Sequence, residues 1–126
     1  SGNTWFMDGA GNISVTAPKN FTVNAGENIT MTAGKNVTVS AGDDMDNSAG
    51  KNITQTAGND LSQSAMGNIT EMSNNRTEMV EKDFIRQADT SNEIASEVTI
   101  FSQKENMTLQ SGKTVEVNSA EKSKMF

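Results

Sequence analysis

Apolar and polar residues alternate along most of the chain in units of eight residues. Read from Gly11, the units are GNISVTAP, KNFTVNAG, ENITMTAG, KNVTVSAG, DDMDNSAG, KNITQTAG, NDLSQSAM and GNITEMSN. The third position is always apolar, the fifth is apolar in the first four units, and the seventh is Ala in seven successive units. Because side chains alternate between the two faces of a strand, these three positions share one face. The pattern predicts a strand in each unit, since a helix would need apolar spacings of three and four.

The apolar residues at the third and fifth positions form the predicted core. In the regular part and near the end of the chain they are Ile13, Val15, Phe21, Val23, Ile29, Met31, Val37, Val39, Met45, Ile53, Leu61, Ile69, Met107, Leu109, Val115 and Val117. The 78 residues from Val39 to Val117 make nine octads plus six residues. We therefore expect one unit in between to have lost two residues.

The predicted turns lie at the ends of the octads. Five consecutive octads end in Gly, at Gly26, Gly34, Gly42, Gly50 and Gly58. Gly adopts positive φ at little cost, which predicts a corner every eight residues. The second position is Asn or Asp in all eight octads, and these side chains often bond to nearby backbone at turns. Each octad is thus predicted to be a short strand followed by a bend.

The markers of the repeat are lost over residues 75–96, which are richer in charge. Val80, Phe84 and Ala88 lie there at helical spacing, so a short helix or a bulged loop is one interpretation. Continued strands with looser turns are the favoured one. The sequence therefore divides into a junction at 1–10, regular octads at 11–74, an irregular part at 75–96 and a resumed repeat with a tip at 97–126.

Composition limits what such a chain builds alone. Only 33% of the residues are hydrophobic and 5% are aromatic, which leaves disorder or repetition as the two interpretations. One octad buries about three side chains, too few to offset ordering eight residues at roughly 1–2 kcal/mol each. Stacking is required, and two geometries provide it. Either three octads of one chain form a triangular coil that stacks on the next coil, or three chains wind around one axis.

Octads of the type KNITxxAG, with Ile or Val at positions three and five, resemble the C-terminal needle of VgrG proteins, the spike of the bacterial type VI secretion system. The resemblance is clearest over residues 11–74 and returns in ENMTLQSG and KTVEVNSA. The opening TWFMDGAGNI is similar to the junction at which such needles leave the preceding domain, and the missing initiator Met at Ser1 agrees with an upstream part.

The resemblance implies an all-β fold, an intertwined homotrimeric triangular β-helix that punctures membranes as a structural, non-enzymatic part. It further implies tube and baseplate proteins as partners upstream and a PAAR-type cap protein at the C-terminal end. Such a spike is assembled in the bacterial cytoplasm and then secreted into the extracellular space or a target cell. Three copies of Lys124, Met125 and Phe126 are the expected docking surface for the cap, with a frayed tail as the alternative. A trimeric adhesin or stalk is the leading alternative function.

Polar residues interrupt the predicted core at the fifth position, at Asn47, Gln55, Gln63 and Glu71. In a trimer each would form a ring of three around the axis, and buried amides need partners. Amide ladders with trapped water are favoured over a bound ion. Burial of Glu71 is the most costly of the four, because three buried carboxylates repel one another.

Other candidate chemistry is weak. The chain has no His and no Cys, so we expect no nucleophile–base pair, no cofactor site and no metal site. The protein is therefore not expected to be an enzyme. The net charge of −6 disfavours nucleic-acid partners. Eight Asn-x-Ser/Thr triplets follow from the repeat itself, and Asp43-Asp44-x-Asp46 lacks the remainder of a calcium loop. Outward Thr pairs such as Thr30 and Thr32 resemble ice-binding arrays, but the outer positions vary too much for a flat lattice.

Overall fold

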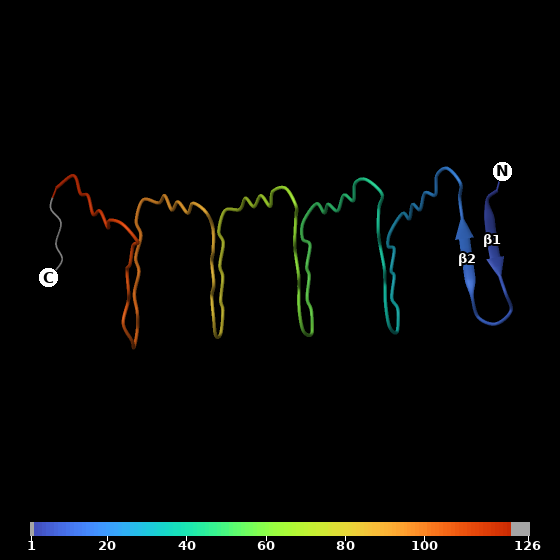
Figure 1. Cartoon of the computed structure of the whole chain (residues 1–126). Helices are drawn as coiled ribbons and strands as arrows, with labels where there is room; N and C mark the ends of the chain where they lie inside the picture. The colour runs from blue at the N-terminus through green and yellow to red at the C-terminus, as the bar shows by residue number, and fades with distance from the viewer. Residues whose placement is uncertain (1, 122–126) are drawn as a thin grey trace. The chain divides into compact units, whose positions relative to one another are not determined.

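The computed structural model describes residues 2–121, and its regular secondary structure is a single β-hairpin near the N-terminus (Figure 1). Strand β1, Thr4–Met7, pairs with β2, Ile13–Thr16, in an antiparallel register that sets Trp5 opposite Val15. The alternation of apolar and β-branched residues in both strands suits a hairpin. No helix occurs within residues 2–121.

The loop of the hairpin is organised by Asp8. Its carboxylate accepts hydrogen bonds from the backbone N–H of Ala10 at 2.7 Å, the backbone N–H of Asn12 at 3.1 Å and the side-chain amide of Asn12 at 2.6 Å. The backbone N–H of Asp8 donates to the carbonyl of Asn12 at 3.2 Å. Gly9 and Gly11 have φ values of 77° and 96°, which residues with a Cβ rarely adopt. The sequence DGAGN thus supplies both the acceptor and the two flexible residues that the turn requires.

This hairpin differs from the expected start of the repeat. The first octad, Gly11–Pro18, had the pattern of the octads that follow it, and residues 1–10 were expected to be a junction. Instead, β2 lies within that octad and pairs with β1 from the preceding residues. The turn residues explain the difference, because Asp and Gly between two alternating stretches are a strong hairpin signal.

After β2 the backbone consists of open segments separated by bends (Figure 1). In the first part of the chain the bends come every eight residues. They lie at Pro18–Lys19, Gly26–Glu27, Gly34–Lys35, Gly42–Asp43, Gly50–Lys51, Gly58–Asn59 and Met66–Gly67. The bends therefore fall between consecutive octads of the sequence repeat.

The glycines at these bends do not have the conformation that the sequence led us to expect. The chain bends at each of the five octad-ending glycines, yet positive φ is found only at Gly2, Gly9 and Gly11. A Cβ added to Gly34 or any of the other four would meet no atom of the chain within 4 Å. The bend itself is therefore compatible with ordinary residues in the single chain.

The bends continue through the irregular segment and to the end of the described residues. They lie at Asn74, Glu81–Lys82, Asp89–Thr90, Ser96, Gln103–Glu105, Gly112–Lys113 and Ala120–Glu121. The intervals ending at Glu81 and at Ser96 are shorter than eight residues, so the shortfall is shared between two units. Within residues 75–96 no helix forms. Val80 and Phe84 have helical spacing because one residue precedes a bend and the other follows it.

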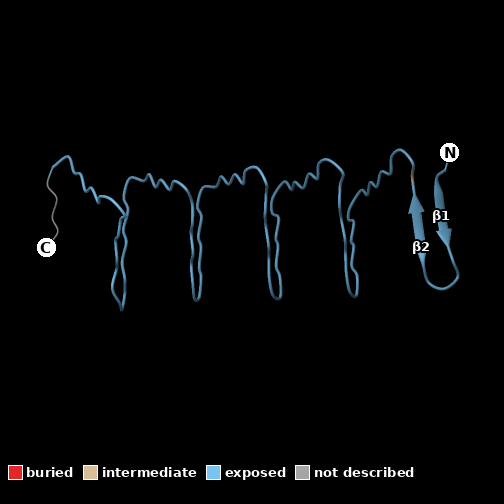
Figure 2. Cartoon of the chain, in the orientation of Figure 1, coloured by how far each residue is buried: buried red, intermediate tan, exposed pale blue. Residues whose placement is uncertain are grey.

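Side-chain exposure shows no hydrophobic core within residues 2–121 (Figure 2). None of the residues that the structure describes is buried, and only Ala17 is partly covered. The accessible surface is 14558 Å², whereas a folded protein of this mass exposes about 6,500 Å². The chain divides into two units, Ser1–Met66 and Gly67–Phe126, and the boundary between them lies at a bend.

Candidate functional site

The most extensive feature available for function is the face that carries the third, fifth and seventh positions of each octad, here called the apolar face. All sixteen residues of the predicted core are exposed, from 43% for Val15 to 74% for Leu109. Burying a side chain of this kind fully contributes about 1.5–3 kcal/mol. The face therefore holds a large unused capacity for association.

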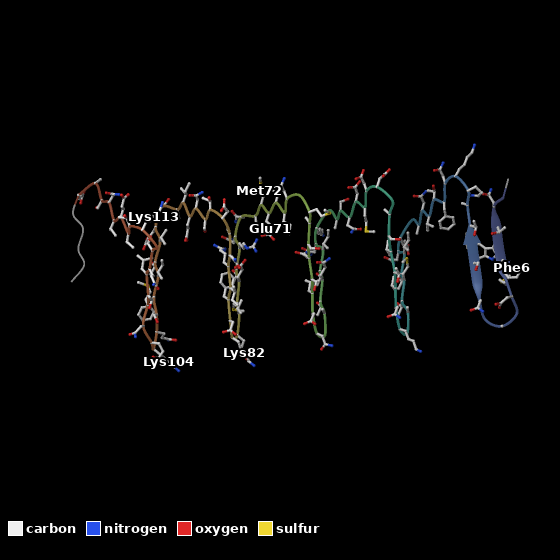
Figure 3. All side chains as sticks on the ribbon, viewed as in Figure 1. Phe6, Glu71, Met72, Lys82, Lys104 and Lys113 are labelled. Atoms are coloured by element: carbon white, nitrogen blue, oxygen red, sulfur yellow. The ribbon has the colours of Figure 1, made fainter. Side chains whose placement is uncertain are left out.

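The opposite face of the segments is more exposed and carries few apolar residues. Over residues 11–89 its apolar side chains are 86–109% exposed, and they are Met66, Met72, Met79 and Ile85. Figure 3 shows Glu71 and Met72, which are neighbours in sequence, on opposite sides of their segment. The difference in exposure separates the two faces independently of the sequence pattern. It also extends the assignment into the irregular part, where Val80 and Phe84 are 51% and 58% exposed.

The backbone between β2 and Glu121 forms a second unused surface. Outside the hairpin, the described part of the chain contains no backbone–backbone hydrogen bond. Backbone N–H and C=O groups in folded proteins are almost always paired, and strands pair along both edges. The segments after β2 thus offer both of their edges to other strands.

The direction of the chain in the second unit reverses at intervals of three segments. Lys82 and Lys104 each lie at the tip of a loop (Figure 3), and two further bends, at Asp89–Thr90 and Ser96, separate them. Three segments thus separate the two loop tips. Within residues 2–121 the successive turns of this single chain do not pair with one another.

Charged residues interrupt the apolar face in the second unit. Arg76 forms ion pairs with both Glu71 and Glu78, and its Nε donates a hydrogen bond to Oε1 of Glu78 at 2.7 Å. Glu71 lies two residues after Ile69, and Arg76 and Glu78 alternate with the highly exposed Met79, so all three belong to the apolar face. The carboxylate of Glu71 thus has an ion-pair partner, the guanidinium of Arg76 in the following unit.

A second cation on the same face lies one unit further along the chain. The guanidinium of Arg86 is 5.6 Å from the centroid of the Phe84 ring, a distance at which the ring attracts a cation. Ile85, between them, is on the opposite face with 86% exposure. Over residues 67–89 the apolar face thus carries two acidic and two basic residues. In the octads from Gly11 to Met66 it carries none.

The sequence pattern located Glu71 but missed its partner. Arg76 and Glu78 follow a shortened interval, so counting strict octads placed neither on the apolar face. Counting back in steps of two from the bend at Glu81 would have found them, because Val80, Glu78 and Arg76 then share one face. No hydrogen bond of Asn47, Gln55 or Gln63 is found within residues 2–121.

Several kinds of site are not found in the described part of the chain. Residues 2–121 contain no group of three acidic, His or Cys side chains placed to hold a metal ion. No helix there has the length and apolar character that crossing a bilayer requires. The predicted tip, Lys124, Met125 and Phe126, lies outside the described residues.

Comparison with known proteins adds no relative. No protein-family model, no curated protein and no solved structure matches the chain.

Proposed function

We propose that this chain is one of three identical strands of an intertwined, triangular β-helix, and that this helix is the puncturing needle of a type VI secretion spike. The observation that carries the assembly is the apolar face, which repeats in every octad and finds no cover within the chain. The open backbone edges support the same conclusion, because each requires a neighbouring strand.

The surface area indicates how large the missing interface is. Three chains have a mass of about 40 kDa, and a compact protein of that mass exposes about 15,000 Å². A single chain exposes 14558 Å² already. Each chain would therefore bury on the order of 10,000 Å² in a compact trimer. A slender rod buries less, but an area of this scale still exceeds that of ordinary obligate interfaces.

The mechanical role follows from this architecture together with the resemblance of the octads to VgrG needles. A closed set of strand ladders has no long loops to deform, and the bends occupy only a few residues each. Such a rod transmits axial force from a contracting sheath to its tip. The tip would carry a PAAR-type cap protein, and no residue on the shaft is required to do chemistry.

Light scattering combined with small-angle X-ray scattering tests the assembly. We expect a mass of about 40 kDa and the profile of a rod. A folded 13.5 kDa monomer would contradict both the assembly and the needle.

A delivery assay then separates the needle from a trimeric stalk. Deleting this segment from the spike should abolish effector delivery by sheath-contracting cells, while sheath assembly continues. Unchanged delivery would contradict the puncturing role and leave the trimeric rod standing.

A further inference from the structure

The repeat itself leaves the alignment of three chains poorly specified. The first four octads place Ile, Val, Phe, Met and Ala at equivalent positions, and the next three repeat an amide at the fifth position, so sliding one chain by eight residues mostly replaces one layer by a similar one. Register in strand assemblies is set by differences between positions, and uniform strands are prone to slip. Something other than the apolar octads must therefore set the alignment.

The charged residues of the apolar face are the main departure from this uniformity. Glu71, Arg76, Glu78 and Arg86 fall in three successive units, and none of the octads from Gly11 to Met66 has a charge on this face. Arg76 joins Glu71 to Glu78, and Arg86 lies over Phe84 in the next unit. The charges of these four residues sum to zero in each chain.

We propose that these four residues, here called the charged layer, are the recognition site through which identical chains align in register. The inference rests on the proposed trimer. In register, the charged layers of three chains meet, and each charge has opposite charges and polar groups as neighbours. After a slip of one or more octads, the charged layers of the chains overlap only in part, and some of the charges face octads without charge, such as Leu61, Gln63 and Ala65. Burying ions in apolar surroundings is costly, so the aligned state is selected.

Half-exposure in the single chain agrees with a layer that becomes complete only on assembly. The side chains of Arg76, Glu71 and Glu78 are 54%, 50% and 37% exposed, although all three are already paired. Ion pairs that remain in water contribute little, whereas buried polar groups are known to fix the register of coiled coils. The charged layer is thus a means of specificity more than of stability.

The decisive experiment measures register directly. The chain contains no Cys, so a single spin label can be attached at Lys35→Cys, on an exposed bend. Three aligned chains place the labels at the corners of an equilateral triangle and give one distance by pulsed electron paramagnetic resonance. Each octad of slip moves one label by about 4.8 Å along the axis and adds further distances.

The test variant replaces the charged layer by apolar residues: Glu71→Val, Arg76→Ile, Glu78→Val and Arg86→Val. We expect the labelled variant to melt at the same or a higher temperature, as other apolar replacements of buried ion groups do. We expect several distances, or larger staggered assemblies, in place of the single distance. One unchanged distance in this variant would overturn the proposal.

A matched control neutralises the same number of charges of each sign at exposed bends: Glu81→Gln, Lys82→Gln, Asp89→Asn and Lys104→Gln. This variant should keep the single distance. Loss of the single distance here as well would show that total charge, and not the charged layer, sets the register.

A single substitution tests whether the layer is buried on assembly. Arg76→Met leaves Glu71 and Glu78 without their cation, and we expect the melting temperature to fall by on the order of 10 °C. A pair that stays in water would change it by about 2 °C or less, which would contradict a buried layer. A wild-type mass of one chain would instead contradict the proposed trimer, so the two failures are distinguishable.

Discussion

Asp8 shows how much structure one side chain organises when the chain has no core. It accepts hydrogen bonds from Ala10 and Asn12, and the side-chain amide of Asn12 is the main cause that lowers the pKa of its carboxyl group, followed by the backbone N–H groups. These bonds favour the charged form. The hairpin is therefore held by local polar contacts, whereas the later segments have no equivalent of this loop among the described residues.

The hairpin loop is expected to respond to acid. Because the pKa of Asp8 is lowered in the folded loop, its contribution is complete above the ordinary value of about 4. The contribution is lost as the pH falls through the lowered value. We expect Asp8→Ala to speed amide exchange at Ala10 and Asn12 at neutral pH and to abolish the acid dependence there. Asp43→Ala, at a bend, is the control and should leave both unchanged.

Glycines in the hairpin and at the octad bends should respond to alanine for different reasons. Gly9 has φ of 77°, so Gly9→Ala strains the backbone by about 1–2 kcal/mol. Gly34 has an ordinary φ and free space around it in the single chain, where Ala would be neutral or slightly stabilising. We expect Gly34→Ala to lower the melting temperature of the assembly nonetheless, because neighbouring chains crowd the corner. A raised melting temperature would show that the corner is open.

At the scale of the element, the eight-residue segment is the unit that the sequence predicts best. The bends fall where the octads end up to Asn74, and they continue at intervals of seven or eight residues through 75–96, where polar or charged residues such as Glu81 and Asp89 stand at the bends in place of Gly. Strand alternation also located the apolar face, and the exposures of Val80 and Met79 separate the two faces where the octad count fails. The two-residue alternation of a strand thus predicts the face of a residue more reliably than the eight-residue repeat does.

The sequence did not predict the elements that depend on particular local contacts. The sequence did not predict the hairpin, because Ile13 and Val15 match the octad pattern as well as they match a strand paired with β1. The sequence did not predict the ion pair between Glu71 and Arg76, because the unit that contains Arg76 is shorter than eight residues and a strict octad count puts Arg76 on the other face. Burial of the apolar face is a property of the proposed assembly, because its proposed cover is another copy of the chain.

Matched substitutions on the two faces of one segment test the assignment of the apolar face. Ile53 is 62% exposed in the single chain, and Thr54 follows it on the opposite face. We expect Ile53→Asp to prevent assembly, because a trimer would bury three unpaired carboxylates and lose about 1.5–3 kcal/mol of apolar burial per chain. Thr54→Asp should keep the mass of three chains. Equal tolerance of both variants by light scattering would contradict the assignment.

At the scale of the whole molecule, folding and association are expected to be one process. A chain that exposes more than twice the surface of a folded protein of its mass gains little by ordering alone. Most of the hydrophobic stabilisation becomes available only when other chains cover the apolar face. The isolated chain is then a partner in assembly rather than a folded unit.

This coupling predicts a melting temperature that depends on protein concentration. Mass action shifts the equilibrium toward the trimer as concentration rises, so we expect each tenfold dilution to lower the melting temperature measured by circular dichroism at the β-sheet band. Loss of that signal should coincide with the fall in mass by light scattering. Melting that is independent of concentration would indicate a chain stable by itself.

The hairpin has a consequence for how other chains can pair with the first octad. A stack of strands that remains open at an end recruits further strands, and uncontrolled recruitment produces amyloid-like fibrils. β2 belongs to the first octad, and one of its two edges is already occupied by β1. β1 thereby occupies that edge with a piece of the same chain, so β2 cannot pair there with a strand of another copy unless β1 is displaced.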